Sequence, residues 1–281
     1  MTAAAALPPG VSGADVVALL DGDACARHDW LAEEVPVSLV LNGIAHAVML
    51  ATPADLEDFA AGFVLTEGLL DDLAELYDVE VSEVAQGIEL RLQVSAACAW
   101  RLRERRRTMA GRTGCGLCGT EQLDQVRRRL APCPVVRVAP AAMARALGAL
   151  GAHQAVQRLT GAVHAAAWCG PDGELRLVRE DVGRHNALDK LIGGLRRTGL
   201  APAEGFACVT SRASFEMVQK TAAAGIGALA AVSAPTRLAV DTARELGLAL
   251  AGFVRGGGAV AYTFPERFVA APGAQEAVDG R

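Results

Sequence analysis

From Ala162 onward, short apolar runs alternate with amphipathic segments, and this alternation constrains the fold more than any other feature of the sequence. Strands that alternate with helices predict a largely parallel sheet covered by helices on both faces. We therefore predict a three-layer α/β domain with a mixed sheet over residues 122–270. Its predicted strands cover residues 162–169, 174–179, 206–210, 226–232, 248–254 and 259–263, and its predicted helices cover residues 122–130, 140–159, 184–197, 214–224 and 235–246.

The N-terminal third predicts a second, smaller unit. Asn42-Gly43, between two apolar runs, is a strong signal for a two-residue hairpin turn. Thr52 and Pro53 suit the N-cap and first position of a helix. That helix is predicted to bury one apolar face, and a second hairpin follows. The predicted units are a disordered tail over residues 1–25, rich in Ala, Pro and Gly, a small α+β domain over 26–98, a linking segment over 99–121 and a C-terminal tail over 271–281.

Charge and cysteine usage exclude several classes of protein. The 281 residues carry a net charge of −5, which argues against a nucleic-acid-binding protein. The N-terminus lacks the basic start and apolar block of a signal peptide, and the most apolar window is interrupted by Gly225 and Pro235. Seven cysteines without regular spacing are not typical of a secreted disulfide framework. We predict a cytoplasmic protein with neither nucleic-acid nor membrane partners.

Two thiols, Cys115 and Cys118, lie in the glycine-flanked stretch Arg-Thr-Gly-Cys-Gly-Leu-Cys-Gly at 112–119. The glycines predict a mobile loop rather than a helix. Arginines at positions 101, 103, 105, 106, 107 and 112 create a positive field that lowers a cysteine pKa and favours the nucleophilic thiolate.

A half zinc site is disfavoured because the sequence has no second Cys-x-x-Cys pair, and a thioredoxin-like dithiol would directly follow a strand. We predict no metal site. The remaining cysteines are interpreted as core fillers or bystanders: Cys25, Cys98, Cys133, Cys169 and Cys208.

Polar residues also gather where predicted strands pass into helices. His185 lies in the polar stretch 180–190, and Arg212 lies in Ser-Arg-Ala-Ser at 211–214, where a helix N-terminus would favour an anion. A glycine loop after the strand 248–254 would let backbone approach a ligand closely. The alternatives are ordinary helix capping and a plain β-turn. The loop comprises Phe253, Val254, Arg255, Gly256, Gly257 and Gly258.

Taken together, these motifs resemble one family, the formate dehydrogenase accessory sulfurtransferases (FdhD). The matching stretches are GFVLTEG at 62–68, RTGCGLCG at 112–119, EDVGRHNALDK at 180–190, SRASFEMVQK at 211–220, SAPTRLA at 233–239 and FVRGGG at 253–258. The resemblance implies that the larger domain resembles the cytidine deaminase fold and that the protein is a homodimer. The sequence lacks the His-x-Glu and Pro-Cys-x-x-Cys ligands of a zinc deaminase, so deamination is disfavoured.

The resemblance also implies a function. Members accept persulfide sulfur from a cysteine desulfurase and transfer it to the molybdenum (or tungsten) bis(guanine dinucleotide) cofactor, which apo formate dehydrogenase requires. Carried over to this sequence, Cys115 would hold the persulfide, Cys118 would assist or serve as a second carrier, and residues 253–258 would contact Mo-bis(molybdopterin guanine dinucleotide) as a substrate. No tightly held metal of its own is implied. The competing hypotheses are a non-catalytic chaperone of the same cofactor and a zinc-stabilised interaction module.

Overall fold

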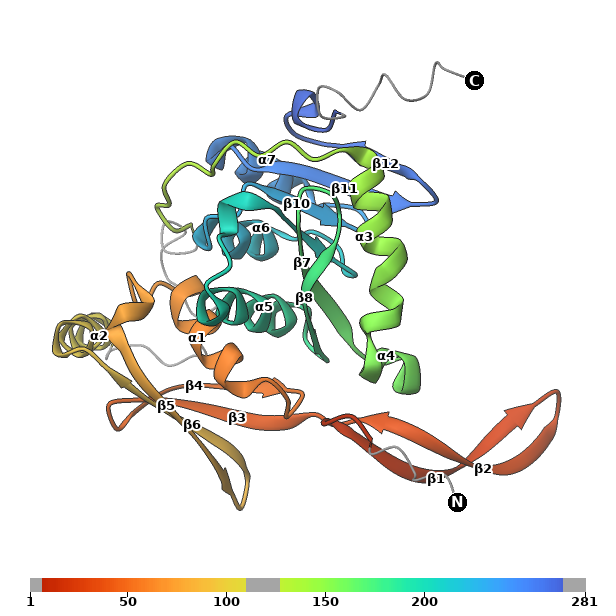
Figure 1. The fold of residues 1–281 in the computed structure, drawn as a ribbon. Coiled ribbons are helices and arrows are strands. Elements are labelled where there is room, and N and C mark those ends of the chain that lie inside the picture. Colours follow the sequence, from red (N-terminus) through yellow and green to blue (C-terminus); the bar gives the residue numbers. More distant parts are fainter. Residues whose placement is uncertain (1–6, 110–126, 270–281) are drawn as a thin grey trace.

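The computed structural model describes residues 7–109 and 127–269, and Cys115 and Cys118 lie outside them. The described chain forms a small α+β unit, a larger three-layer α/β unit and an N-terminal hairpin that extends away from both (Figure 1). None of the helices in these two ranges is long and apolar enough to cross a membrane.

The small unit contains a four-stranded sheet, ordered β4-β3-β6-β5, with one face packed against helix α1. The Asn42-Gly43 turn connects β3 and β4 as predicted, and both residues have positive φ. Phe59 and Val64 of α1 are fully buried against the sheet, which confirms the predicted apolar face. The elements are β3 (Val35–Leu41), β4 (Ile44–Ala51), α1 (Leu56–Thr66), β5 (Leu76–Val84), β6 (Gly87–Val94) and α2 (Ala96–Met109), with a short 3-10 turn over Leu73–Glu75.

Two local predictions for the N-terminal third of the chain are wrong. Residues 11–25, predicted as part of a disordered tail, belong to the hairpin of β1 (Val11–Leu20) and β2 (Asp23–Ala32). Its base packs onto the larger unit through Val11 and Trp30, and Asp21-Gly22 supplies the turn with two positive φ angles. The N-cap of α1 is Asp55, not Thr52. The arginine-rich run up to position 109 is helical because Cys98 and Leu102 anchor α2 in the core of the small unit.

The larger unit is built on a six-stranded sheet ordered β12-β11-β10-β9-β7-β8. Only β9, β10 and β11 are parallel neighbours, because β7 pairs antiparallel with both β8 and β9, and β12 pairs antiparallel with β11. The sheet is therefore mixed, as predicted, although its parallel part is limited to β9, β10 and β11. Its strands are β7 (His164–Cys169), β8 (Leu175–Asp181), β9 (Phe206–Val209), β10 (Ala228–Ala231), β11 (Ala249–Arg255) and β12 (Gly258–Ala261).

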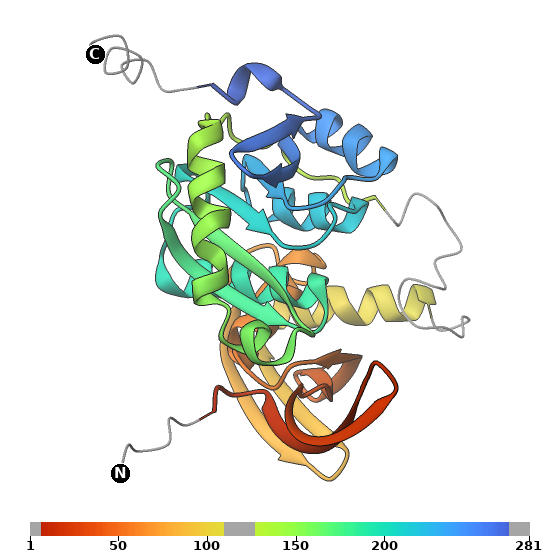
Figure 2. The same ribbon diagram turned by 90° about the vertical axis from the view of Figure 1, so that its right-hand side faces the viewer.

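Helices cover both faces of this sheet, which confirms the three-layer prediction (Figures 1 and 2). One face packs against α5, α6 and α7, and the other packs against α3, because alternate strand residues point into the two cores. The predicted helix over 140–159 breaks at Gln154, and residues 127–130 are not helical. The helices are α3 (Pro140–His153), α4 (Ala155–Thr160), α5 (Arg184–Thr198), α6 (Phe215–Ala223) and α7 (Arg237–Leu246), with 3-10 turns over Pro202–Glu204 and Pro265–Arg267.

Candidate functional site

The polar motifs of the larger unit meet at one edge of its sheet. Because β7 is antiparallel to both β8 and β9, β8 runs in the same direction as β9, β10 and β11. The carboxyl ends of these four strands therefore lie at the same edge, where open α/β sheets bind ligands. The residues that follow β8, β9 and β10 include His185, Arg212 and Ser233, and Phe253 lies near the end of β11.

The loops at this edge are tied to one another by backbone contacts. Ala213, after β9, forms a parallel bridge with Pro235, after β10, and the Thr236 N–H donates to the Ala213 carbonyl at 3.0 Å. The Phe253 N–H donates to the Ser233 carbonyl at 3.3 Å, which connects the end of β11 to the same group. The edge is therefore one continuous surface rather than three separate loops.

Helix α6 begins at this edge with a polar atom that has no partner. The Ser214 side chain occupies the N-cap position of α6 but does not cap it, and its Oγ atom is buried without a hydrogen-bond partner among the described residues. By contrast, the Thr236 side chain caps α7 by accepting from the Ala239 N–H at 3.2 Å. A buried hydroxyl at a helix N-terminus, with exposed Arg212 two residues earlier, provides donors and positive potential for an anion.

His185 joins the first turns of two helices. Its Nε2 atom in α5 lies 2.7 Å from Glu216 Oε2 in α6, although the ring nitrogen is not aligned for a hydrogen bond to it. The imidazole beside Glu216 holds the pKa of that carboxyl below its ordinary value. Burial, reinforced by the nearby Arg184 and His185, lowers the pKa of His164 at the start of β7. Both shifts show that the surroundings of His185 stabilise a negatively charged group and disfavour an additional positive charge.

The glycine loop is a tight turn between β11 and β12. Gly256 and Gly257 have φ values of 56° and 83°, and Arg255 pairs with Gly258 across the turn. The local structure of this loop is therefore the plain β-turn that was the alternative to a ligand-binding loop. The Arg255 guanidinium lies 5.9 Å from the centre of the partly exposed Phe253 ring. The Val254 side chain is buried in the core beside α3, so it does not face the edge.

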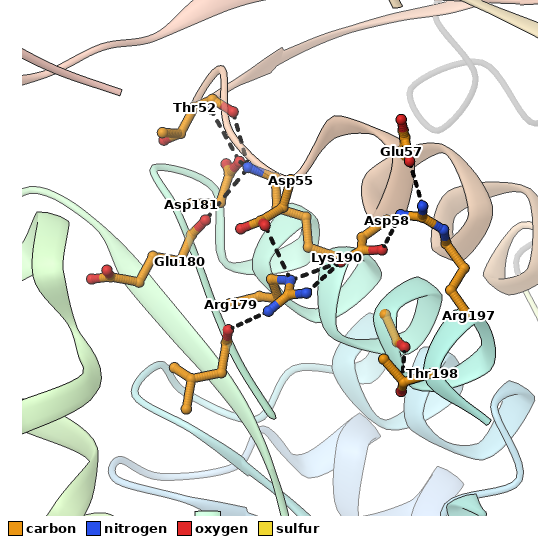
Figure 3. A network of polar contacts seen from close by, with 12 residues as sticks. Thr52, Asp55, Glu57, Asp58, Arg179, Glu180, Asp181, Lys190, Arg197 and Thr198 are labelled. Atoms are coloured by element: carbon orange, nitrogen blue, oxygen red, sulfur yellow. Dashed lines mark hydrogen bonds and ion pairs between the residues drawn. The ribbon is translucent and has the colours of Figure 1, made fainter. Parts of the chain in front are cut away.

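Most other polar residues of the 180–190 stretch connect the two units instead of lining the edge (Figure 3). Lys190, whose side chain is fully buried, lies 2.6 Å from Asp181 Oδ2 and donates to the Thr52 carbonyl at 2.9 Å. The Thr52 N–H in turn donates to Asp181 Oδ2 at 3.0 Å. Ordinary helix capping does not describe these residues. They bind a distant part of the chain, which no local sequence pattern could predict.

The motif after β9 contributes to the same junction. Lys220 of α6 donates to Asp189 of α5 at 2.9 Å and to Glu67 at 2.7 Å. Burial alone would lower the pKa of Lys220, but the carboxylates of Asp189 and Glu67 outweigh this and raise it. Asp58 of α1 similarly binds Arg179 and Arg197, each at 2.6 Å. Lys220 and Asp189, together with these ion pairs of Asp58, therefore hold the two units together.

The cysteines outside the Cys-x-x-Cys motif are mostly core residues. Cys98, Cys133, Cys169 and Cys208 are buried, and Cys25 is exposed on the hairpin. Burial raises the pKa of Cys133 to about 11, so its thiolate is unavailable at neutral pH. Within the described ranges, no group of three or more His, Cys, Asp or Glu residues is placed to hold a metal ion.

Comparisons with known proteins agree with this architecture. The model of the FdhD/NarQ family matches residues 32–269. A protein of Variovorax paradoxus named "Sulfur carrier protein FdhD" is 59% identical over 247 residues, covering 88% of this chain and 89% of its own length. Its namesake from Chromobacterium violaceum is 52% identical over 262 residues, covering 90% and 96%.

A crystal structure from Desulfotalea psychrophila, described as that of a proposed formate dehydrogenase accessory protein, has the same fold. It superimposes with a TM-score of 0.75 at 23% identity, covering 93% of this chain and 100% of that chain. The match of the family model across most of the chain, together with relatives more than half identical over nearly nine-tenths of it, establishes the family. The chain belongs to the FdhD/NarQ family.

Proposed function

We propose that this protein is a sulfur carrier for the maturation of formate dehydrogenase. The observation that carries the proposal is its 59% identity with a protein named for that role, over a region that includes the Cys-x-x-Cys motif. In the proposed first step, the Cys115 thiolate attacks the terminal sulfur of a persulfide on a cysteine desulfurase. The donor cysteine leaves as a thiolate, and the sulfur remains at the same oxidation level on Cys115.

In the proposed second step, sulfur leaves Cys115 for the molybdenum (or tungsten) bis(guanine dinucleotide) cofactor, which is a substrate here. The Cys118 thiolate can attack the inner sulfur of the Cys115 persulfide. A Cys115–Cys118 disulfide then forms, sulfide departs toward the cofactor, and a cellular thiol reduces the disulfide afterwards. Cys118→Ala should therefore load sulfur but release it slowly.

The carboxyl edge of the larger sheet supports the nucleotide part of this proposal. The unpartnered Ser214 Oγ, the exposed Arg212 and the pair of His185 with Glu216 converge on the starts of α5 and α6. Backbone N–H groups at a helix start suit a diphosphate. No heavy atom of the described residues lies within 4 Å of a Cβ built on Gly256 or Gly257, so a ligand can approach the backbone of this turn. These residues would hold the guanine dinucleotide ends.

The proposed partners follow from the same reaction. They are a cysteine desulfurase, the apo formate dehydrogenase and a second copy of the chain in a cytoplasmic homodimer. A test is transfer of radiolabelled sulfur from desulfurase-bound persulfide to the cofactor, followed by the activity of the receiving dehydrogenase. Wild type should pass the label on, and Cys115→Ala should not.

A non-catalytic chaperone of the same cofactor is the second candidate, because the described edge offers an anion site independent of both cysteines. The two candidates differ in one outcome. A chaperone with Cys115→Ala would still deliver the cofactor and support dehydrogenase activity at the wild-type level, without ever carrying label.

A further inference from the structure

The hairpin of β1 and β2 leaves the body of the protein beyond its base. Val11, Trp30 and Ala32 join a hydrophobic cluster with the larger unit, whereas none of residues 14–29 belongs to a hydrophobic cluster of the described chain. We call residues 14–29 the arm, and Figure 1 shows it pointing away from both units. An isolated two-stranded hairpin is marginally stable in water at best, so the arm lacks the packing that would hold it in place.

One face of the arm is apolar throughout its outer half. Opposed residues of antiparallel strands share a face, and the register pairs Val17 with Ala26 and Leu19 with Ala24. Val17 and Leu19 are 62% and 80% exposed, and both alanines are exposed as well. The other face is more polar and includes Arg27. A continuous exposed apolar surface of this kind is typical of an interaction site.

The small sheet has an uncovered apolar surface of its own. Helix α1 covers the face that carries the buried side chains of β3, so the alternate residues of β3 lie on the opposite face. On that face, Pro36 pairs with Leu50 and Ser38 pairs with Val48. Val48 and Leu50 are 65% and 54% exposed, and Pro36 is exposed too. We call this surface the outer face of β3 and β4.

The arm and the outer face match in size and in character. Each is about 25 Å long and 10 Å wide, from a strand rise of about 3.3 Å and a strand spacing of about 4.8 Å. One contact between them would bury roughly 500 Å² over both surfaces, half of the ~1,000 Å² that a specific interface needs. Two copies related by a two-fold axis make the contact twice and reach that size. Within one chain, the base of the hairpin directs the arm away from the outer face (Figure 1).

Charge argues against a membrane surface as the occupant of the arm. Asp21 lies in the turn at its tip and Asp23 follows the turn, and anionic lipid headgroups would repel both carboxylates. Arg27 is the one basic residue in the sequence of the arm, and it is paired with Asp29 at 2.6 Å. An apolar protein surface therefore suits the arm better than a lipid surface.

We propose that the arm of each copy packs its Val17 and Leu19 face onto the outer face of β3 and β4 in a second copy, so that two arms close a homodimer. This inference rests on the homodimer of the proposed function and names its contact surfaces. It does not depend on sulfur transfer. Because both surfaces belong to the same chain, a two-fold dimer covers all of them at once.

The oligomeric state of the full-length protein, measured by sedimentation equilibrium, tests the contact from both sides. Wild type should be a dimer at micromolar concentration. We expect Leu19→Asp and Leu50→Asp each to raise the Kd of the dimer at least tenfold, because the contact would bury an unpaired charge. Val135→Asp changes an exposed valine outside both surfaces and should dimerise like wild type. Urea unfolding of each variant verifies that the protomer is folded.

A chemical cross-link tests which surfaces meet. Cys25 is an exposed thiol on the arm, whereas Cys115 and Cys118 are replaced by alanine in this experiment so that they do not react. Adding Val48→Cys should then give covalent dimers with a bismaleimide, and replacing Cys25 by serine should abolish them. Val135→Cys in place of Val48→Cys should give none. Equal cross-linking from positions 48 and 135 would contradict the proposed contact.

The outcomes separate this inference from the proposed function. A wild type that stays monomeric contradicts the homodimer and the arm contact together. A dimeric wild type whose Leu19→Asp and Leu50→Asp variants dimerise equally well contradicts the arm contact alone, and a dimer that never gains sulfur contradicts the carrier function alone. Binding to phosphatidylglycerol vesicles that Leu19→Asp abolishes, with dimerisation unchanged, would assign the arm to a lipid surface and overturn the proposal.

Discussion

Gly62 of α1 and Gly193 of α5 lie against each other where the two helices cross. A Cβ built on Gly62 would lie 2.9 Å from the Gly193 nitrogen, and one built on Gly193 would lie 2.7 Å from the Gly62 nitrogen. Each would also overlap a carbonyl oxygen of the opposite helix, that of Asp189 or Asp58. The two helices therefore touch backbone to backbone at this crossing, and only glycine fits at either position.

Gly193→Ala should accordingly lower the free energy of unfolding by about 3 kcal/mol, because backbone atoms cannot move aside as a flexible side chain could. Gly148→Ala, also within a helix but with no atom near its Cβ position, should instead stabilise the protein by up to about 1 kcal/mol. Urea unfolding of both variants measures the difference. Equal effects of the two substitutions would contradict the close crossing.

The buried Lys220–Asp189 pair should be costly to break from one side. Lys220→Met leaves the Asp189 carboxylate, which is 1% exposed, without its counter-charge, and should lower the free energy of unfolding by about 3–5 kcal/mol. Arg237→Met, which breaks the surface pair with Asp241, should change it by less than about 1 kcal/mol. Adding Asp189→Asn to Lys220→Met should recover part of the loss, and its failure to do so would argue against a charge effect.

The attachment of α2 should weaken in acid. Hydrogen bonds from Arg101 lower the pKa of Glu75 to about 2, with the Ser95 hydroxyl also donating to it. Because the folded-state pKa lies below the ordinary value of 4.5, this contribution is present above about pH 4.5 and is lost as pH falls toward 2.

Glu75→Gln should therefore destabilise the protein by about 0.5–1 kcal/mol at pH 7, a modest value because Arg101 is a third exposed. The difference between the variant and wild type should shrink as pH falls through this window, measured by urea unfolding at several pH values. A difference that is constant from pH 7 to pH 3 would exclude the Glu75 carboxylate as its source.

Nucleotide binding tests the candidate edge independently of sulfur. GDP should bind more tightly than ADP, and Arg212→Ala should weaken both alike, because the guanidinium supplies charge without base selectivity. Ser214→Ala should weaken both several-fold, because the bound nucleotide loses its hydrogen bond to the Ser214 hydroxyl. Gly257→Val, at a φ of 83°, should distort the turn and block binding. Calorimetry on wild type and the three variants with both nucleotides measures these effects, and GDP binding that survives all three substitutions would place the site elsewhere.

Local signals in the sequence were sufficient for much of the fold. The Asn42-Gly43 turn and the strand–helix alternation after Phe206 predicted elements close to those observed, since both depend on neighbouring residues. The hairpin over 11–32 was missed although Asp21-Gly22 carried the same kind of turn signal as Asn42-Gly43. Its alanine-rich strands masked that signal.

The candidate site was predictable only in part. Strand ends could be assigned to one sheet edge, so Arg212 and His185 were expected close to the same ligand. Nothing local indicated that Thr52 would bind Asp181, 129 positions away, or that Lys190 would be buried between them. Such contacts arise from tertiary packing, which is why several polar residues of the 180–190 stretch instead join the two units.

The measurement that tests the sulfur-carrier account most directly is the intact mass of the protein after incubation with a cysteine desulfurase and cysteine. Wild type should gain about 32 Da, the mass of one sulfur atom, and a reducing thiol should remove it. Cys115→Ala should show no mass gain, while Cys25→Ala should load like wild type. A wild-type protein whose mass does not change under these conditions would contradict the account.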